Sequence, residues 1–206
     1  SDFFIISAGL DSHAPNRGDA YKSSYQFLSE MDRAVSGIFH RIDGFASHSY
    51  PNKDFSENPA HTERGGIVAY REEITFLMRR FGRPDLPIFI TETGWQTSKV
   101  SEEEAALFYQ YAFQNVWREA NIVAITPFLL NGHGSAFAGF SLLRTDGSPS
   151  KVFETIVSLP KVKGQPTLAY EEKRGVQKNT PGYFKYFQDR DPQVPPALTI
   201  SQPLRA

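Results

Sequence analysis

The side chain with the clearest chemical potential in this sequence is Glu92, which stands near Trp95 in the run Thr-Glu-Thr-Gly-Trp that begins at Thr91. It follows an apolar, strand-like run, so its carboxylate is partly removed from water unless it is paired or takes part in a reaction. By two-residue alternation, Ile88, Ile90 and Glu92 are expected to share one strand face. A carboxylate beside an aromatic ring can attack an anomeric carbon while the ring binds the sugar. We therefore interpret Glu92 as a candidate nucleophile and Trp95 as a candidate sugar contact, with a glutamate–arginine pair as the alternative.

Four further polar residues stand at the ends of neighbouring predicted strands, namely His48, Tyr50, Asn131 and His133. His48 and Tyr50 are two positions apart in a strand and point the same way. They could hold a nucleophilic carboxylate in place or contact sugar hydroxyls. Asn131 and His133 alternate with glycines and could line the rim of a substrate site. The structural alternatives are a buried histidine–tyrosine pair and a flexible loop.

Composition and spacing exclude several other kinds of chemistry. The 206 residues include no cysteine, which excludes disulfides and thiolate metal sites. The histidines lack metal-ligand spacing, and no nucleotide-binding or Gly-x-Ser-x-Gly motif occurs, so we expect no metal and no cofactor. The formal net charge of -1 gives no basic face for nucleic acid, and no apolar run has transmembrane length, so neither nucleic acid nor a membrane is an expected partner.

Short apolar runs alternate with helical patterns along the chain. Gly37 and Gly82 are placed to end two of the helices, and Ser101 with Glu104 forms a capping-box pattern at the start of a third. The expected strands are residues 3–8, 42–50, 87–91 and 122–130, and the expected helices are residues 21–36, 66–81, 101–119 and 150–158.

This order predicts an α/β fold with a parallel (βα) repeat, because strands that alternate with helices favour a parallel sheet. Such a repeat fits a doubly wound sheet or a (β/α)8 TIM barrel, of which four units are half. We predict that residues 1–160 form the C-terminal half of such a barrel. Residues 161–206 are rich in proline and contain an aromatic cluster. They are expected to pack on the barrel or to link to a missing domain.

The run 90–95 resembles the end of the seventh strand in clan A glycoside hydrolases, which are retaining (β/α)8-barrel enzymes of cellulase-like, β-xylosidase-like and β-glucanase-like families. The runs 48–51, 125–128 and 7–10 resemble the ends of their sixth, eighth and fifth strands. The resemblance implies that this chain corresponds to strands 5–8 of the barrel, with Glu92 as the nucleophile.

The resemblance covers residues 3–159, with two departures. The family's acid/base glutamate follows an asparagine on the fourth strand, and this chain contains no Asn-Glu pair. The family's tryptophan on the eighth strand is replaced by Phe128 or Leu129. Retaining hydrolysis needs two carboxyl groups roughly 5–5.5 Å apart, so the chain alone is expected to be incomplete. The expected partners are a carbohydrate substrate and either a missing N-terminal barrel half or a second copy of the chain.

The predicted function is that of a retaining glycoside hydrolase for the O-glycosyl bonds of β-linked polysaccharides or oligosaccharides, with its acid/base residue missing from this chain. The alternative is a non-catalytic carbohydrate-binding or assembly protein derived from a glycosidase barrel. A βα-repeat enzyme of the aldolase type ranks last, because no lysine ends a strand where it could form a Schiff base.

Overall fold

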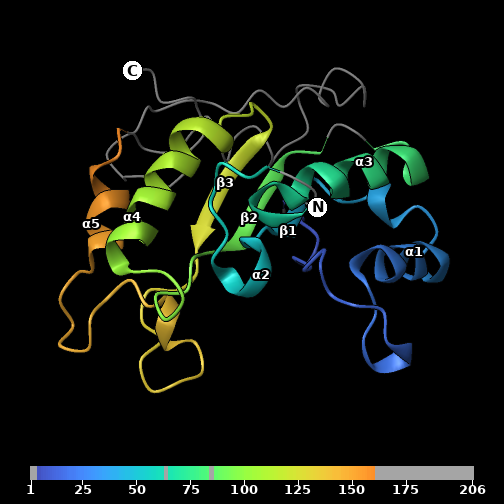
Figure 1. Cartoon of the computed structure of the whole chain (residues 1–206). Coiled ribbons are helices and arrows are strands. Elements are labelled where there is room, and N and C mark those ends of the chain that lie inside the picture. Colours follow the sequence, from blue (N-terminus) through green and yellow to red (C-terminus); the bar gives the residue numbers. More distant parts are fainter. Residues whose placement is uncertain (1–3, 63–64, 84–85, 161–206) are drawn as a thin grey trace.

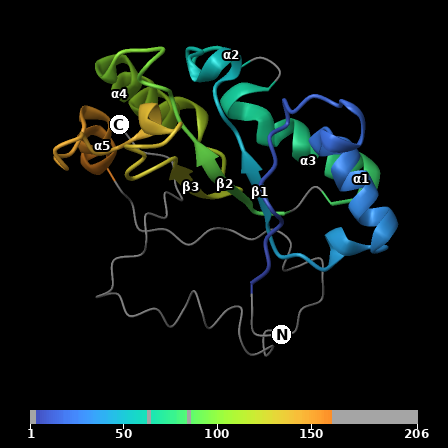
Figure 2. The same cartoon turned by 90° about the horizontal axis from the view of Figure 1, so that it is seen from below.

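The computed structural model of this chain describes residues 4–62, 65–83 and 86–160 (Figure 1). Those residues form an α/β unit in which three parallel strands make one sheet in the order β1-β2-β3. The helices gather on one side of that sheet (Figure 2). The strands are β1 (Phe45–His48), β2 (Ile88–Thr93) and β3 (Ile122–Pro127), and the α-helices are α1 (Ser24–Ala34), α2 (Asn52–Phe55), α3 (Ala69–Phe81), α4 (Glu102–Tyr111) and α5 (Lys151–Ser158).

Local sequence signals determine several helix ends as predicted. The Ser101 hydroxyl accepts a hydrogen bond from the backbone N–H of Glu104, and the Glu104 side chain accepts one in return, which is the expected capping box of α4. Helix α3 ends at Gly82, whose φ of 67° is a left-handed conformation that favours glycine. Gly37 also has a left-handed φ, of 73°, shortly after the end of α1.

The helix predicted to run from 101 to 119 changes geometry part-way. Helix α4 ends at Tyr111, and a π-helical turn follows over Ala112–Val116. This turn ends at Trp117, whose backbone N–H donates to the carbonyl of Ala112. The wider turn and the helix end at this point were not predicted, because a π-helical turn of five residues is too short to show a change in the apolar period.

The first predicted strand, over residues 3–8, is the main difference from the expected fold. Within the described residues this run makes only an isolated parallel bridge, between Ile6 and Gly44. The backbone N–H of Ala46 donates to the Ser7 hydroxyl at 2.9 Å, so a side chain takes the place of a backbone acceptor and the ladder is interrupted. The segment nevertheless lies along β1, because the backbone N–H of Ser7 donates to the carbonyl of Gly44 at 3.2 Å.

The hydrophobic core lies between the sheet and the helices. Ile88 and Ile90 of β2 are completely buried there, and each such side chain stabilises the fold by roughly 1.5–3 kcal/mol relative to an exposed one. The face of the sheet that bears Ile88 and Ile90 is called the helix face below. The largest fully buried side chains are Tyr70, Tyr109, Phe39, Phe45, Phe113, Leu28, Ile67, Leu77, Leu86, Ile88, Ile90 and Ile122.

The structure confirms the α/β class and the parallel order of the (βα) units. The assignment of these units to half of a closed barrel stays a prediction, as does the division at residue 160, because residues 161–206 lie outside the described part of the chain. Among the described helices, none combines the length and the apolar character needed to cross a bilayer.

Candidate active site

An extra residue in β2 determines where the candidate nucleophile points. Ser47 of β1 pairs with Ile90, but the next residue, His48, pairs with Glu92, so Thr91 is additional in the ladder. The pairing with β3 shows a register irregularity over the same part of β2. Irregularities of this kind are β-bulges, which redirect side chains and occur often beside active sites.

The bulge corrects the expectation that Ile88, Ile90 and Glu92 share a face. Paired residues of adjacent strands point to the same side of a sheet, so Glu92 lies on the side of His48. We call this side the site face. The contrast in exposure agrees, since Ile88 and Ile90 are 0% exposed whereas the side chain of Glu92 is 34% exposed. If Thr91 were paired as a regular ladder residue, alternation from Ile90 would place the carboxylate of Glu92 on the helix face.

Glu92 contacts His48, the last residue of β1, and Tyr50, which lies two residues after that strand. The hydroxyl of Tyr50 donates a hydrogen bond to Oε2 of Glu92 at 3.0 Å. Nδ1 of His48 lies 3.4 Å from the same oxygen. The structure therefore brings together three of the residues that the sequence singled out, and it places both neighbours on Oε2. No hydrogen bond to Oε1 occurs among the described residues, so that oxygen is the one suited to react with a ligand.

The electrostatics of this contact keep Tyr50 protonated. Burial, and then the negative charge of the neighbouring Glu92, raise the pKa of the Tyr50 hydroxyl well above its usual value. A phenol in this state is a permanent hydrogen-bond donor near neutral pH. It can hold one carboxylate oxygen without taking the negative charge for itself.

The imidazole of His48 is confined on the side opposite Glu92. A Cβ atom added at Gly9 would lie 2.2 Å from both Cδ2 and Nε2 of His48, which shows that the ring packs directly on the Gly9 backbone. The backbone N–H of His48 also donates to the carbonyl of Leu10 at 3.2 Å. The segment before β1 therefore sets the position of His48, although it forms no regular strand.

Trp95 does not occupy the position that was expected of it. Its side chain is 2% exposed, and its indole N–H donates to the backbone carbonyl of Glu57 at 2.7 Å. The ring packs against Phe108, Tyr109 and Trp117, at centroid distances of 5.7, 4.9 and 6.2 Å. Trp95 is a core residue in this structure and has no face free to stack on a sugar.

Asn131 and His133 are exposed, but both form hydrogen bonds within their own loop. Oδ1 of Asn131 accepts from the backbone N–H of His133 at 3.1 Å. Nε2 of His133 lies 2.8 Å from the carbonyl oxygen of Leu143. These contacts organise the loop after β3, and no contact joins either residue to Glu92 within the described part of the chain.

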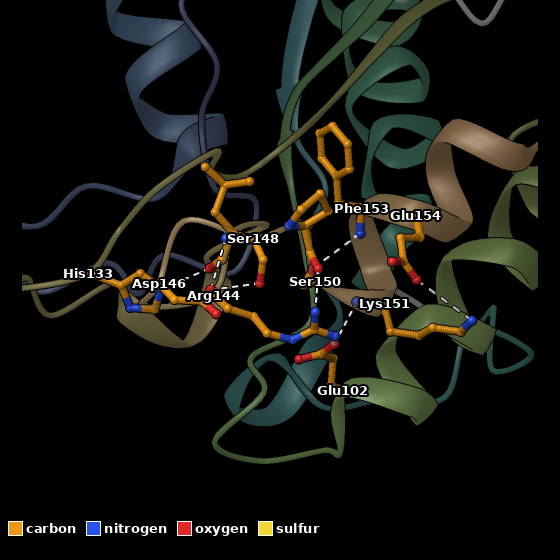
Figure 3. A network of polar contacts seen from close by, with 11 residues as sticks. Glu102, His133, Arg144, Asp146, Ser148, Ser150, Lys151, Phe153 and Glu154 are labelled. Carbon is orange, nitrogen blue, oxygen red and sulfur yellow. Dashed lines mark hydrogen bonds and ion pairs between the residues drawn. The ribbon is translucent and has the colours of Figure 1, made fainter.

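Figure 3 shows His133 at one end of a polar network that continues to the N-termini of α4 and α5. Oε1 of Glu102 accepts hydrogen bonds from the Arg144 guanidinium at 2.7 Å and from the backbone N–H of Lys151 at 2.5 Å. Ser150 caps α5 by accepting from the backbone N–H of Phe153 at 3.2 Å. Glu102 therefore has a structural role, because it joins the first turn of α4 to the first turn of α5.

Comparisons with known proteins give one partial likeness. No protein-family model matches this chain, and no curated protein matches it. A solved structure that is similar in part is a family 39 glycoside hydrolase from the gut symbiont Bacteroides cellulosilyticus WH2, with a TM-score of 0.38 and 19% sequence identity. The similarity covers 64% of this chain and 29% of that chain, so this chain spans less than a third of the enzyme's length.

The aromatic rings around Tyr50 were missed by the sequence reasoning. Phe55, Phe128 and Phe140 contact the Tyr50 ring edge-on, at centroid distances of 5.2, 6.3 and 5.9 Å. Of these, only Phe128 had been placed near a strand end. The available signal was the position of Phe55 just after the second strand, since the segments that follow parallel strands meet at one edge of a sheet.

The described residues contain no group of three or more histidine or acidic side chains arranged to hold a metal ion. The polar groups assembled on the site face are a carboxylate, a phenol and an imidazole. Such a set can act as a nucleophile with two orienting partners.

Proposed function

We propose that this chain contains the nucleophile of a retaining glycoside hydrolase that cleaves β-linked polysaccharides or oligosaccharides. The single observation that supports this proposal is the geometry of Glu92. Its carboxylate stands at the carboxyl end of a parallel strand and is partly exposed. The Tyr50 hydroxyl and Nδ1 of His48 both contact Oε2 of this carboxylate. Functional groups of parallel α/β folds collect at this end of the strands.

The geometry suits a double-displacement reaction. Oε1 of Glu92 attacks the anomeric carbon, the bond to the leaving oxygen breaks, and a carboxylic acid protonates that oxygen. Water then attacks the glycosyl-enzyme, the same acid group now accepts its proton, and the bond to Glu92 breaks. The Tyr50 hydroxyl fixes Oε2 throughout, so the nucleophile loses little orientation between steps.

The proposal includes a second carboxyl group that is supplied from outside this chain. In the described residues, Glu92 has no carboxyl group among its hydrogen-bond and ion-pair partners. An N-terminal barrel half, or a second copy of the chain, would provide that group. In this arrangement β1, β2 and β3 correspond to the sixth, seventh and eighth strands of a (β/α)8 barrel.

The test is a reaction that needs no acid. Activated 2-deoxy-2-fluoro glycosides have leaving groups that depart without protonation, so a correctly placed nucleophile forms a stable adduct on its own. Incubating the chain with the gluco, xylo and manno reagents should add one glycosyl mass, which peptide mapping assigns to Glu92. The adduct should be absent in Glu92→Gln and present in Glu103→Gln, which alters an exposed glutamate on α4.

Two results would contradict the proposed role of Glu92. An adduct that persists in Glu92→Gln, or no adduct with any of the three reagents, would overturn the assignment of the nucleophile.

A second candidate is a non-catalytic carbohydrate-binding or assembly protein derived from such a barrel. The observation that favours it is the lack of a second carboxyl group at Glu92 among the described residues. Binding of oligosaccharides by a chain that forms no adduct would select this candidate over the first.

A further inference from the structure

A row of aromatic rings extends from the nucleophile to the surface on two sides. Phe55 contacts Tyr50 at 5.2 Å, Tyr50 contacts Phe128 at 6.3 Å, and Phe128 contacts Phe137 at 5.4 Å between ring centroids. We call these four rings the aromatic row. Phe140 packs beneath it, against three of its members. The row is continuous with the candidate active site, because Tyr50 is hydrogen-bonded to Glu92.

The two ends of the row are exposed, whereas its middle is not. Phe55 is 38% exposed and Phe137 is 51% exposed. Tyr50 and Phe128 between them are only partly accessible, and the underlying Phe140 is 7% exposed. Phe55 and Phe137 therefore leave apolar surface in water, while the inner rings pack against one another and against Phe140. Exposed apolar surface that adjoins a polar site commonly marks a binding surface.

The loop that presents Phe137 is held by its own hydrogen bonds. The backbone N–H of Phe137 donates to the Ser135 hydroxyl at 3.1 Å, and that hydroxyl donates to the carbonyl of Gly132 at 2.8 Å. At the base of the loop, Leu129 donates to the carbonyl of Phe140 at 3.2 Å. The contacts of Asn131 and His133 described above belong to the same loop. A ring fixed in this way can bind a ligand with little loss of conformational entropy.

We propose that Phe55 and Phe137 are the two stacking platforms of an oligosaccharide that runs along the aromatic row across Glu92. A pyranose ring has an apolar C–H face that packs on an aromatic ring while its hydroxyl edge stays in water. The outer rings have no ring contact with each other among the described residues and are connected through two inner rings, which suits a chain of sugar units. This inference rests on the proposed function, and it assigns to the two phenylalanines the role that Trp95 does not fill.

The proposal is tested by binding as a function of chain length. Isothermal titration with β-linked glucose, xylose and mannose series, from disaccharide to hexasaccharide, should show affinity that rises with length in the unmodified chain. Phe55→Ala and Phe137→Ala should each weaken binding of the longest ligand roughly 3- to 10-fold, since an aromatic contact is worth about that factor. Their effect on adduct formation with the single-unit fluoro reagents should be much smaller.

Matched variants separate stacking from general packing. Phe27→Ala removes a ring of similar exposure, 42%, from α1 and should leave binding unchanged. Phe137→Trp should keep affinity, whereas Phe137→Leu, which retains apolar volume without a ring face, should lose it.

The outcomes distinguish this inference from the proposed function. Binding that depends on both phenylalanines without any adduct supports the inference and counts against the nucleophile. An adduct at Glu92 together with unchanged oligosaccharide binding in both alanine variants overturns the inference alone. Failure of the unmodified chain to bind any of the three series also overturns it.

Discussion

Two glutamates on opposite faces of the same sheet show how surroundings decide what a carboxyl group can do. Glu92 on the site face is partly exposed, and its Oε2 contacts the Tyr50 hydroxyl and Nδ1 of His48. Glu73 on α3 lies behind β1, is 0% exposed, and has no hydrogen-bond partner on either oxygen within the part of the chain that the structure describes. Burial raises the pKa of Glu73 to about 8, an effect that the nearby Ser47 hydroxyl partly offsets. The first carboxyl group is accessible to a ligand beside two polar side chains, whereas the second is kept neutral near pH 7.

Access to water and to hydrogen-bond donors separates a glutamate that is available for a reaction from one that is inert. Burying a charge without a partner is costly, so a glutamate such as Glu73 takes up a proton instead. The bulge at Thr91 turns Glu92 away from the helix face and so keeps it out of such surroundings. The two residues differ by the side of the sheet on which they lie, and the experiments below act on that difference.

The largest expected effect is a pH dependence of stability that originates at Glu73. The unfolded chain loses this proton near pH 4.5, while the folded chain keeps it until about pH 8. The free energy of unfolding should therefore fall as pH rises between these values, by an amount on the order of a few kcal/mol. Asp11 and Glu72 contribute in the same direction, because their negative charges also raise the pKa of Glu73.

Urea unfolding at a series of pH values measures this effect. Glu73→Gln cannot ionise and should remove most of the slope, whereas Glu103→Gln on the surface should leave it unchanged. The Glu73→Gln variant should still form the glycosyl adduct that Glu92→Gln loses. Equal slopes in the unmodified chain and in Glu73→Gln would show that Glu73 is not the neutral member of the pair.

The next effect concerns the donor to Glu92. Tyr50→Phe keeps the ring and its contacts but removes the hydrogen bond to a carboxylate, which is worth about 10- to 100-fold in rate. Adduct formation should slow by that factor, with the same site of labelling. Tyr111→Phe, which changes an exposed tyrosine on α4, is the control and should react normally. A Tyr50→Phe variant that reacts at the original rate would mean that the carboxylate is oriented by other groups.

The smallest of these effects is expected at Gly9. Alanine at this position would press on the imidazole of His48 and on the Thr91 hydroxyl, and it should slow adduct formation about tenfold by misplacing a neighbour of the nucleophile. NMR of the His48 ring gives a second measurement, since Glu92→Gln should shift its signals in the unmodified chain and not in Gly9→Ala.

The control for Gly9 is Gly44→Ala, which crowds Phe89, Ile6 and Phe4 instead of His48. If Gly9→Ala does not fold, adding His48→Ala should restore folding, because it removes the main obstacle. The same shift of the His48 signals with and without alanine at position 9 would rule out a positioning role for Gly9.

Local features of the fold were predictable because their causes lie within a few residues. The capping box at Ser101 and the glycine at the end of α3 follow from backbone chemistry that neighbouring residues decide. The meeting of His48, Tyr50 and Glu92 also followed, since the ends of parallel strands converge. The direction in which each of these side chains points was deduced from uninterrupted alternation, which holds for β1 and fails in β2.

The missed features depend on partners that are distant in sequence. Nothing within the run 91–95 indicates that the Trp95 indole donates to Glu57 or packs with Trp117. The bulge arises from pairing with two other strands. Glu73 could have been noticed, because it stands three residues after Tyr70 and four before Leu77, which places it on the apolar stripe of its helix.

The additional residue in β2 also has a consequence for how the gene can vary. Replacing Thr91 by another amino acid keeps the number of residues between Ile90 and Glu92, so the carboxylate still points to the same side. Deleting that one codon would place the carboxylate directly after Ile90, where regular alternation also points it away from the helix face. The side on which the carboxylate lies therefore depends on how Thr91 is paired and not on its presence, so both substitution and deletion of Thr91 should leave Glu92 on the side of His48.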